Sequence, residues 1–247
     1  MFTGLVEQTG FVAALERVDF GARLWIDPRG WSHSPSPGDS IAVDGCCLTV
    51  AALESPGWRF DVVRQTLEVT TLGSFAAGRR VNLERSATPS TLLGGHIVQG
   101  HVDGNGTLES VTRDATQWRV RVVPPPTFMR LVVDRGSIAV DGVSLTVAGI
   151  GPHGEAVAAA TPSSAALSIQ STPSTSSDRR DRSTHATRST SATPSVRPTW
   201  FDVALIPTTL ARTTLGERTA GDRVNLESDC VVRAVAALME WDRAGMG

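Results

Sequence analysis

Two kinds of reactive side chain occupy equivalent positions in a segment that the chain contains twice. Residues 40–50 read SIAVDGCCLTV and residues 137–147 read SIAVDGVSLTV, so nine of eleven positions are identical at a constant offset of 97. Because side chains alternate along a strand, the copies present matching faces, formed by Cys47 and Thr49 in one and by Ser144 and Thr146 in the other. The repeat predicts two equivalent sites with unequal chemistry. A lone cysteine of this kind is more often a small hydrophobic residue than a reactive thiol.

Histidine gives a second indication of unequal sites. Two of the five histidines, His96 and His101, lie in GGHIVQGH, where the two copies join. Leu5 stands opposite His101 in the first copy, at an offset of 96. The reactive residues of the two copies are therefore complementary, which predicts that two bound molecules meet in unequal roles. The simpler alternative is that such a histidine is a polar residue with its hydrogen bonds satisfied.

Neither a metal nor a cofactor is expected. The potential metal ligands are Cys46, Cys47, His96 and His101, but a spacing of five residues along a strand would put the histidines on opposite faces, and the chain has no Cys-x-x-Cys. No Gly-x-Gly-x-x-Gly leads from a strand into a helix, and there is no phosphate loop.

The repeat extends over most of the chain and predicts an all-β fold. Short runs rich in β-branched and aromatic residues alternate with Gly, Pro and Asp, about six runs in each copy, and both copies open with a strand. Closing six strands into a barrel removes exposed edges. Asp-Gly at Asp44 and Asp141 is typical of a tight turn, so these carboxylates are assigned to architecture. A one-turn helix ending at Gly is expected over 66–73 and again over 209–216.

The predicted architecture is two tandem six-stranded Greek-key β-barrels followed by a C-terminal α-helix. The first barrel occupies residues 1–95 and the second residues 96–229. The helix, 230–247, carries an apolar stripe and begins at a cap, Ser228 or Asp229. Packing of this stripe on its own barrel and against a neighbouring chain are equally compatible with the pattern.

An insertion interrupts the second barrel. The repeat offset grows from 97 to 143 between Val147 and Val203, and the extra residues fall at about 151–199. The stretch is rich in Ser and Thr, so it cannot bury enough apolar surface to offset the entropy of ordering it, and a disordered, solvated tether is expected. An anion-docking segment around Arg179, Arg180 and Arg182, or a corrupted reading frame, are the alternatives.

Bulk composition limits the possible partners. The net charge of −2 and a pI near 6.2 give no electrostatic reason to expect nucleic acid or a membrane surface. Three cysteines, two of them adjacent, make a poor disulfide framework and favour a reducing cytoplasm. No long apolar run and no signal-like N-terminus are found, so neither export nor a membrane span is expected.

Several of these motifs, in this order, resemble the riboflavin synthase α-chain family. They are the opening MFTG, the segment GGHIVQGH, the doubled VDGxxLTV and the doubled TLGxxxxGxxVNLE, which together span nearly the whole chain apart from the insertion. The resemblance implies a transferase without cofactor or metal. Such enzymes take two molecules of 6,7-dimethyl-8-ribityllumazine, move a four-carbon unit from one to the other, and release riboflavin and 5-amino-6-ribitylaminouracil.

The resemblance also implies an assembly and a set of site residues. It implies a homotrimer held by the C-terminal helix, with each active site between the first barrel of one subunit and the second barrel of its neighbour, and lumazine synthase as a further partner. Ligand contacts are implied for the first barrel at Gly4, Cys47, Leu48, Thr49, Asp61, Thr66, Gly100, His101 and Val102. For the second barrel they are implied at Arg135, Ser144, Thr146, Ile206, Pro207 and Thr209.

The catalytic roles implied are those of four residues. His101 is the candidate proton carrier, because histidine titrates near neutrality. Cys47 or the Ser144 hydroxyl would add to the acceptor ring or hydrogen-bond with it, and Asp229 would orient a proton shuttle.

Two rival functions remain open at this point. One is a lumazine- or flavin-binding protein of the same fold without catalysis; it is opposed by the joint presence of Cys47, His101, Ser144 and Thr146, and favoured weakly by the insertion. The other is an oligonucleotide-binding barrel, which would need a basic groove with stacking aromatic residues. The chain is slightly acidic and has no Tyr, so the second rival is disfavoured.

Overall fold

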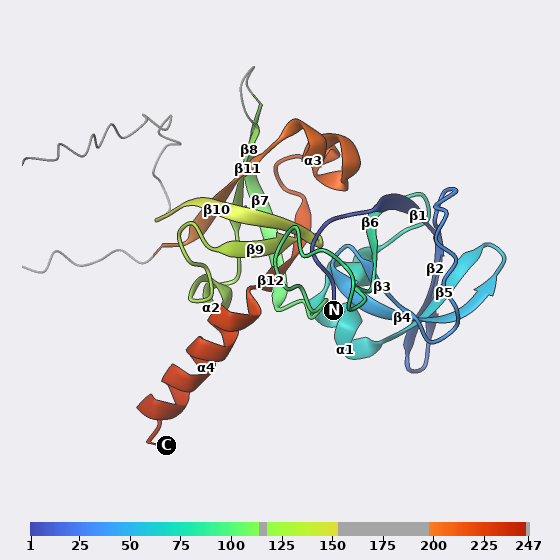
Figure 1. Ribbon diagram of the computed structural model, residues 1–247, viewed down its shortest axis with the longest axis horizontal. Helices are drawn as coiled ribbons and strands as arrows, with labels where there is room; N and C mark the ends of the chain where they lie inside the picture. Colours follow the sequence, from blue (N-terminus) through green and yellow to red (C-terminus); the bar gives the residue numbers. More distant parts are fainter. Residues whose placement is uncertain (114–117, 153–197, 246–247) are drawn as a thin grey trace, which may run out of the picture.

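The computed structural model describes residues 1–113, 118–152 and 198–245. Two closed antiparallel barrels of six strands each lie side by side, and a helix projects from the second (Figure 1). In both barrels the strand order departs from the order along the chain, as in a Greek key. The predicted all-β class, the tandem barrels and the C-terminal helix are confirmed.

The first barrel closes in the order β1-β2-β5-β4-β3-β6. Its strands are β1 Gln8–Val18, β2 Gly21–Asp27, β3 Ser40–Val43, β4 Cys46–Glu54, β5 Gly57–Val63 and β6 Arg80–Arg85. Between β5 and β6 lie α1 (Arg64–Val69) and a 3-10 turn, η1 (Thr71–Ser74). The single helix expected over 66–73 is therefore divided, because the Thr70 side chain accepts a hydrogen bond from Leu72 N and starts a new turn.

The second barrel repeats this plan. Its strands are β7 Gly104–Arg113, β8 Trp118–Val123, β9 Ser137–Val140, β10 Val143–Gly151, β11 Trp200–Leu205 and β12 Arg223–Ser228. The turn-and-helix segment reappears as α3 (Pro207–Arg212) and η2 (Thr214–Glu217), again divided, and a short α2 (Pro126–Met129) is added after β8.

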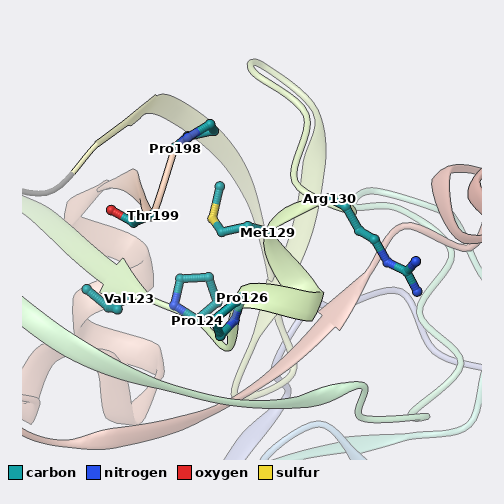
Figure 2. A pocket seen from close by; sticks show the side chains of 7 residues that line it. All are labelled: Val123, Pro124, Pro126, Met129, Arg130, Pro198 and Thr199. Carbon is teal, nitrogen blue, oxygen red and sulfur yellow. The ribbon is translucent and has the colours of Figure 1, made fainter. Parts of the chain in front are cut away.

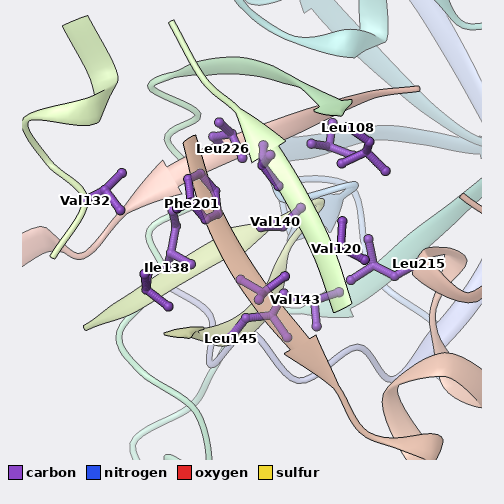
Figure 3. Packing of buried hydrophobic residues seen from close by; sticks show 14 of the residues in the cluster. Leu108, Val120, Val132, Ile138, Val140, Val143, Leu145, Phe201, Leu215 and Leu226 are labelled. Carbon is purple, nitrogen blue, oxygen red and sulfur yellow. The ribbon is translucent and has the colours of Figure 1, made fainter. Parts of the chain in front are cut away.

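Each barrel has its own hydrophobic core, built by alternation along the strands. In β4, Cys46, Leu48 and Val50 point inward, whereas Cys47 and Thr49 point outward. The second core is formed in the same way from inward residues of β7 to β12 (Figure 3). The prediction that the thiol and hydroxyl residues share an outward face is confirmed for both copies.

The two Asp-Gly turns meet at the contact between the barrels. Asp44 and Gly45 both have positive φ, and a Cβ on Gly45 would lie 2.5 Å from Gly142 N, so glycine is required by this close approach. Both turn carboxylates are fully buried; Asp44 accepts from Asn82 N at 2.7 Å and Asp141 accepts from Asn225 N at 2.8 Å. Their assignment to architecture is confirmed.

The second barrel closes across the insertion. In the first barrel β4 and β5 pair through Glu54 and Gly57, with two residues between them. The equivalent pair in β10 and β11 is Gly151 and Trp200. The predicted tether falls almost wholly at 153–197, outside the described residues.

The C-terminal helix, α4 (Cys230–Arg243), is capped by Asp229, which accepts from Val231 N at 2.8 Å. None of its residues is buried within the chain, and Figure 1 shows it extending away from both barrels. Of the two predicted alternatives, packing on its own barrel is therefore not the one adopted. Within the described residues, no helix has the length and apolarity needed to span a bilayer.

Candidate functional sites

Two short arms lead into the barrels and pair with each other. Residues 1–7 precede β1 and residues 97–103 precede β7; we call them the first arm and the second arm. They are not strands: the strand expected at the start of each copy begins only at Gln8 and at Gly104, and the expectation that His96 and His101 lie along a strand is wrong. Phe2 N donates to Val98 O at 2.7 Å and Val98 N donates to Phe2 O at 3.1 Å.

A buried carboxylate anchors each arm to its own barrel. Glu84 of β6 accepts hydrogen bonds from Thr3 N at 2.6 Å, Thr3 Oγ1 at 2.7 Å and Gly4 N at 3.1 Å. Its repeat partner Glu227 of β12 accepts from Gln99 N at 2.7 Å and Gly100 N at 2.9 Å. Burial raises the pKa of both carboxyl groups, and the backbone donors oppose that rise.

The glycine at the tip of each arm, Gly4 or Gly100, lies against the strand of the other barrel that carries Ser144 or Cys47. Gly4 O accepts from Ser144 N at 2.8 Å, and Gly100 O accepts from Cys47 N at 2.9 Å. Both glycines have positive φ, and a Cβ on Gly100 would lie 2.5 Å from the Cys47 Cβ. The arms are thus exchanged, because each is anchored to one barrel and completes the site of the other.

This exchange corrects one implied placement. Gly4 is implied at the first-barrel site, but it contacts Ser144 of the second barrel. Val6, which follows it, is part of the second-barrel core, and Val102 packs against the first. The reason is topological: only the antiparallel pairing of the two arms brings each tip across to the opposite barrel.

The second-barrel site is a pocket of about 220 Å³ between the first arm, β10 and α3. Of the implied ligand residues it contains Gly4, Ser144, Ile206 and Thr209. The other lining residues are Leu5, Val6, Val143, Thr208, Arg212 and Thr213. Several lining residues are apolar, and polar groups come from Ser144 of β10 and Arg212 of α3.

Ser144 has a partner that the sequence did not indicate. His96 Nδ1 lies 2.7 Å from Ser144 Oγ, and the imidazole is buried. Burial lowers the His96 pKa, while Asp229 nearby raises it. The neutral imidazole can accept the serine proton, and its Nε2 is buried with no hydrogen-bond partner. The signal was hidden because His96 and Ser144 are 48 residues apart and no motif links them in the sequence.

The first-barrel site is built around Cys47. The second arm places Gly100 against its backbone and the exposed His101 beside it in sequence. Thr49 lies outward on the same strand, whereas the Leu48 side chain is buried in the core.

Other implied first-barrel residues lie at the edge of this face. Asp61 is exposed on β5 and forms ion pairs with Arg59 at 3.6 Å and Arg23 at 4.0 Å. The Thr66 carbonyl accepts from Thr70 Oγ1 at 2.6 Å, which fixes α1.

Three implied second-barrel residues do not line the 220 Å³ pocket. Thr146 is exposed on β10, and Pro207 begins α3. Arg135 has positive φ, and its backbone N donates to Val147 O at 3.1 Å in the middle of β10. Asp229 has a defined structural role as the α4 cap, and its electrostatic effect on His96 puts it near the Ser144 site.

A separate pocket of about 400 Å³ contains none of the predicted site residues. It is lined by Val123, Pro124, Pro126, Met129, Arg130, Pro198 and Thr199, and the Arg130 side chain extends away from the others (Figure 2). Arg130 pairs with Glu240 of α4. Among the described residues, no cluster of three or more His, Cys, Asp or Glu side chains could hold a metal ion.

Comparison with known proteins agrees with the repeat. A family model described as lumazine binding domain matches residues 3–86, 99–178 and 187–229. Riboflavin synthase of Mycobacterium bovis is 40% identical over 242 residues, covering 97% of this chain and 98% of that protein. The chain belongs to the riboflavin synthase family. Within this family, riboflavin synthase of Brucella abortus is 30% identical, covering 98% of this chain and 100% of its own length.

Solved structures agree in fold. LumP complexed with 6,7-dimethyl-8-(1'-D-ribityl) lumazine and LumP complexed with riboflavin each superpose with a TM-score of 0.66 at 22% identity. Each comparison covers 92% of this chain and 99% of LumP. The paired barrels are therefore an arrangement shared with lumazine-binding proteins.

Proposed function

We propose that the chain catalyses the dismutation of two 6,7-dimethyl-8-ribityllumazine molecules. The donor gives up a four-carbon unit and leaves as 5-amino-6-ribitylaminouracil, while the acceptor gains that unit and leaves as riboflavin, so carbon is conserved. The observation that carries the proposal is the pair of equivalent sites with different reactive groups, Cys47 in one and Ser144 with His96 in the other. Holding both substrates face to face supplies the proximity on which a bimolecular step depends.

The side chains suggest a division of roles. The 7-methyl proton of one lumazine must be removed before that carbon attacks the partner ring, and His101 on the exposed arm is our candidate for the proton carrier. At the second barrel, neutral His96 accepts the Ser144 proton, so the hydroxyl oxygen can add to the acceptor ring or hydrogen-bond with it. Cys47 is the corresponding group of the first barrel.

The assembly we propose is a homotrimer built on α4. The helix exposes an apolar stripe within one chain: Val231, Val235, Leu238, Met239 and Trp241 are all at least half exposed. The 220 Å³ pocket is lined only by second-barrel residues and the first arm, and Cys47 is not among them. Bringing the two ligands together therefore calls for the first barrel of a neighbouring subunit. Sedimentation analysis of wild type and Leu238→Glu tests this; a wild-type monomer would contradict it.

Two further proposals concern the cellular compartment of the enzyme and a partner protein. The three cysteines are free, which suits a reducing cytoplasm. Lumazine synthase, which would supply the substrate, is proposed as a partner; co-sedimentation of the two purified proteins tests that association.

The deciding experiment mixes purified protein with 6,7-dimethyl-8-ribityllumazine and follows riboflavin fluorescence. Turnover supports the proposal. Ligand binding without turnover would instead support the alternative, a non-catalytic lumazine- or flavin-binding protein, for which the similarity to LumP and the insertion within the second barrel are the favouring observations.

A further inference from the structure

A polar pocket of about 530 Å³ lies where α1 and η1 of the first barrel meet β12 of the second. Three of its lining residues are arginines from three different elements, Arg17 of β1, Arg64 at the start of α1 and Arg223 of β12. Glu68 is the single carboxylate among the lining residues. The pocket shares none of its residues with the Ser144 pocket.

The three guanidinium groups are held by neutral acceptors. Arg17 Nη2 donates to Gly73 O at 2.5 Å, Arg64 Nη2 donates to Asp19 O at 3.2 Å, and Arg223 donates to the Asn105 side chain. Within the described part of the chain, none of the three has a carboxylate at ion-pair distance. Neutral acceptors thus position the three positive charges, and Glu68 is the one carboxylate that lines the pocket with them.

The equivalent contact between the barrels, on the other side of the molecule, shows which group pairs with the matching arginine. Arg80 of β6 is the repeat counterpart of Arg223, and Thr9 is the counterpart of Asn105, so Arg80 makes the matching bond to Thr9 at 2.9 Å. Arg80 also forms an ion pair with Glu217 of η2. The counterpart of Glu217 is Ser74, which lines the arginine pocket. Arg80 thus has a carboxylate ion partner across the contact between the barrels, whereas Arg223 has none among the described residues.

The surrounding cations also differ between the two sides. Arg113, the counterpart of Arg17, stacks over Trp118 with its guanidinium carbon 4.3 Å from the ring centroid. The counterpart of Arg64 is Pro207, which carries no charge. At the positions that line the pocket, this side therefore carries three arginines and Glu68, whereas the matching positions carry two arginines and Glu217.

We propose that this pocket binds a phosphate monoester, whose phosphate group takes the position that Glu217 occupies on the opposite side. Arginine presents planar, fixed donors that suit phosphate oxygens, and three such groups match a dianion better than a carboxylate, for which Arg80 alone suffices. A volume of 530 Å³ leaves room for the organic part of a small ester beside the phosphate. The proposal does not depend on the lumazine reaction, because the pocket lies outside both sites.

The test is calorimetric titration of the full chain with glycerol 3-phosphate and, separately, with inorganic phosphate at fixed ionic strength. We expect saturable binding of one ester per chain that weakens as salt is raised, with the ester bound more tightly than inorganic phosphate. Ser74→Glu, which supplies the missing carboxylate, should lower the ester affinity by about tenfold or more. Ser74→Gln, of the same size but uncharged, should retain most of it.

Several results would overturn the proposal. They are an absence of saturable binding to the wild type, unchanged affinity in Ser74→Glu, or equal losses in Ser74→Glu and Ser74→Gln. Tighter binding of inorganic phosphate than of the ester would reject the monoester as the ligand. If Ser74→Glu does not fold, Arg223→Gln replaces it, with the same expected loss. Lumazine turnover of each variant is measured in parallel and should stay within about twofold of wild type, since no residue of either site is altered.

Discussion

The two ligand sites share a scaffold and differ in their reactive groups. In both, a buried Glu anchors an arm, and the carbonyl of a positive-φ glycine accepts a hydrogen bond from the reactive strand of the other barrel. The first-barrel site then offers Cys47 and the exposed His101, whereas the second offers Ser144 bonded to the buried His96. The two sites thus share the anchoring of the arm and differ in their reactive groups.

The largest effect is expected from a methyl group at the arm tips. Gly100→Ala would bring a Cβ to 2.5 Å from the Cys47 Cβ, and Gly4→Ala to 2.6 Å from the Ser144 Cβ, at positive φ in both cases. Each arm must shift, and a displacement of this size costs about 100-fold in turnover. Gly100→Ala should lose the first-barrel ligand and Gly4→Ala the second, as counted by fluorescence titration.

A matched control separates strain from collision at these glycines. Gly30 also has positive φ, but nothing lies within 4 Å of the position that an added Cβ would take, so Gly30→Ala tests the backbone strain alone. It should leave turnover unchanged. Loss of both ligands in a single arm variant would contradict the independence of the two sites.

The two histidines should differ in how they act. His101→Ala is expected to cut turnover far more than it weakens ligand binding, and His96→Asn, which retains a hydrogen-bonding group near Ser144, should lower turnover by about 100-fold. Because burial lowers the His96 pKa, this imidazole keeps its neutral form, which can accept a proton from Ser144, to lower pH than an exposed histidine does. Equal losses in binding and turnover would mean that a histidine only positions the ligand.

The anchoring carboxylates allow a comparison by stability. Glu84→Gln and Glu227→Gln each replace one acceptor oxygen by an amide nitrogen and remove the negative charge, which weakens a group of three hydrogen bonds from the first arm and a group of two from the second. Each should lower the free energy of unfolding by about 1.5–3 kcal/mol, with the larger loss in Glu84→Gln, as measured by urea unfolding. The reverse order would mean that the contacts of the second arm matter more than their number indicates.

The buried turn acids predict a pH dependence. Burial, followed by the neighbouring Asp141, raises the pKa of Asp44 from 3.8 to about 7. The folded state therefore holds a proton that the unfolded state has released, so the free energy of unfolding should fall as pH rises from about 4 to about 7. Asp44→Asn should reduce this slope in urea titrations; an unchanged slope would assign it to other groups.

The smallest effect is expected where the barrels differ most in length. β10 and β11 pair through Gly151 and Trp200 as β4 and β5 pair through Glu54 and Gly57. Deleting residues 163–194 should therefore leave turnover nearly unchanged, and closing a shorter loop should change the free energy of unfolding by no more than about 1–2 kcal/mol. An aggregated or inactive deletion protein would contradict this.

Most of the fold was predictable because both copies of the repeat show the same pattern of strands and turns. Strand alternation correctly oriented Cys47, Thr49 and Ser144, and Asp-Gly correctly marked the turns. The arm exchange was not predictable, since the sequence pattern gives matching positions but not which barrel an arm crosses to. His96 was missed for the related reason that its partner Ser144 lies 48 residues away along the chain.

The exchanged arms bear on how such a molecule can arise. Each barrel relies on a lead-in segment belonging to the other, so a half-length ancestor would have completed its site only by associating with a second copy of itself. Joining two such genes end to end turns that symmetric dimer into one polypeptide with its contacts intact. From then on each half can mutate alone, which gives a direct route from a protein with two identical sites to one in which the sites present different reactive groups, Cys47 and Ser144.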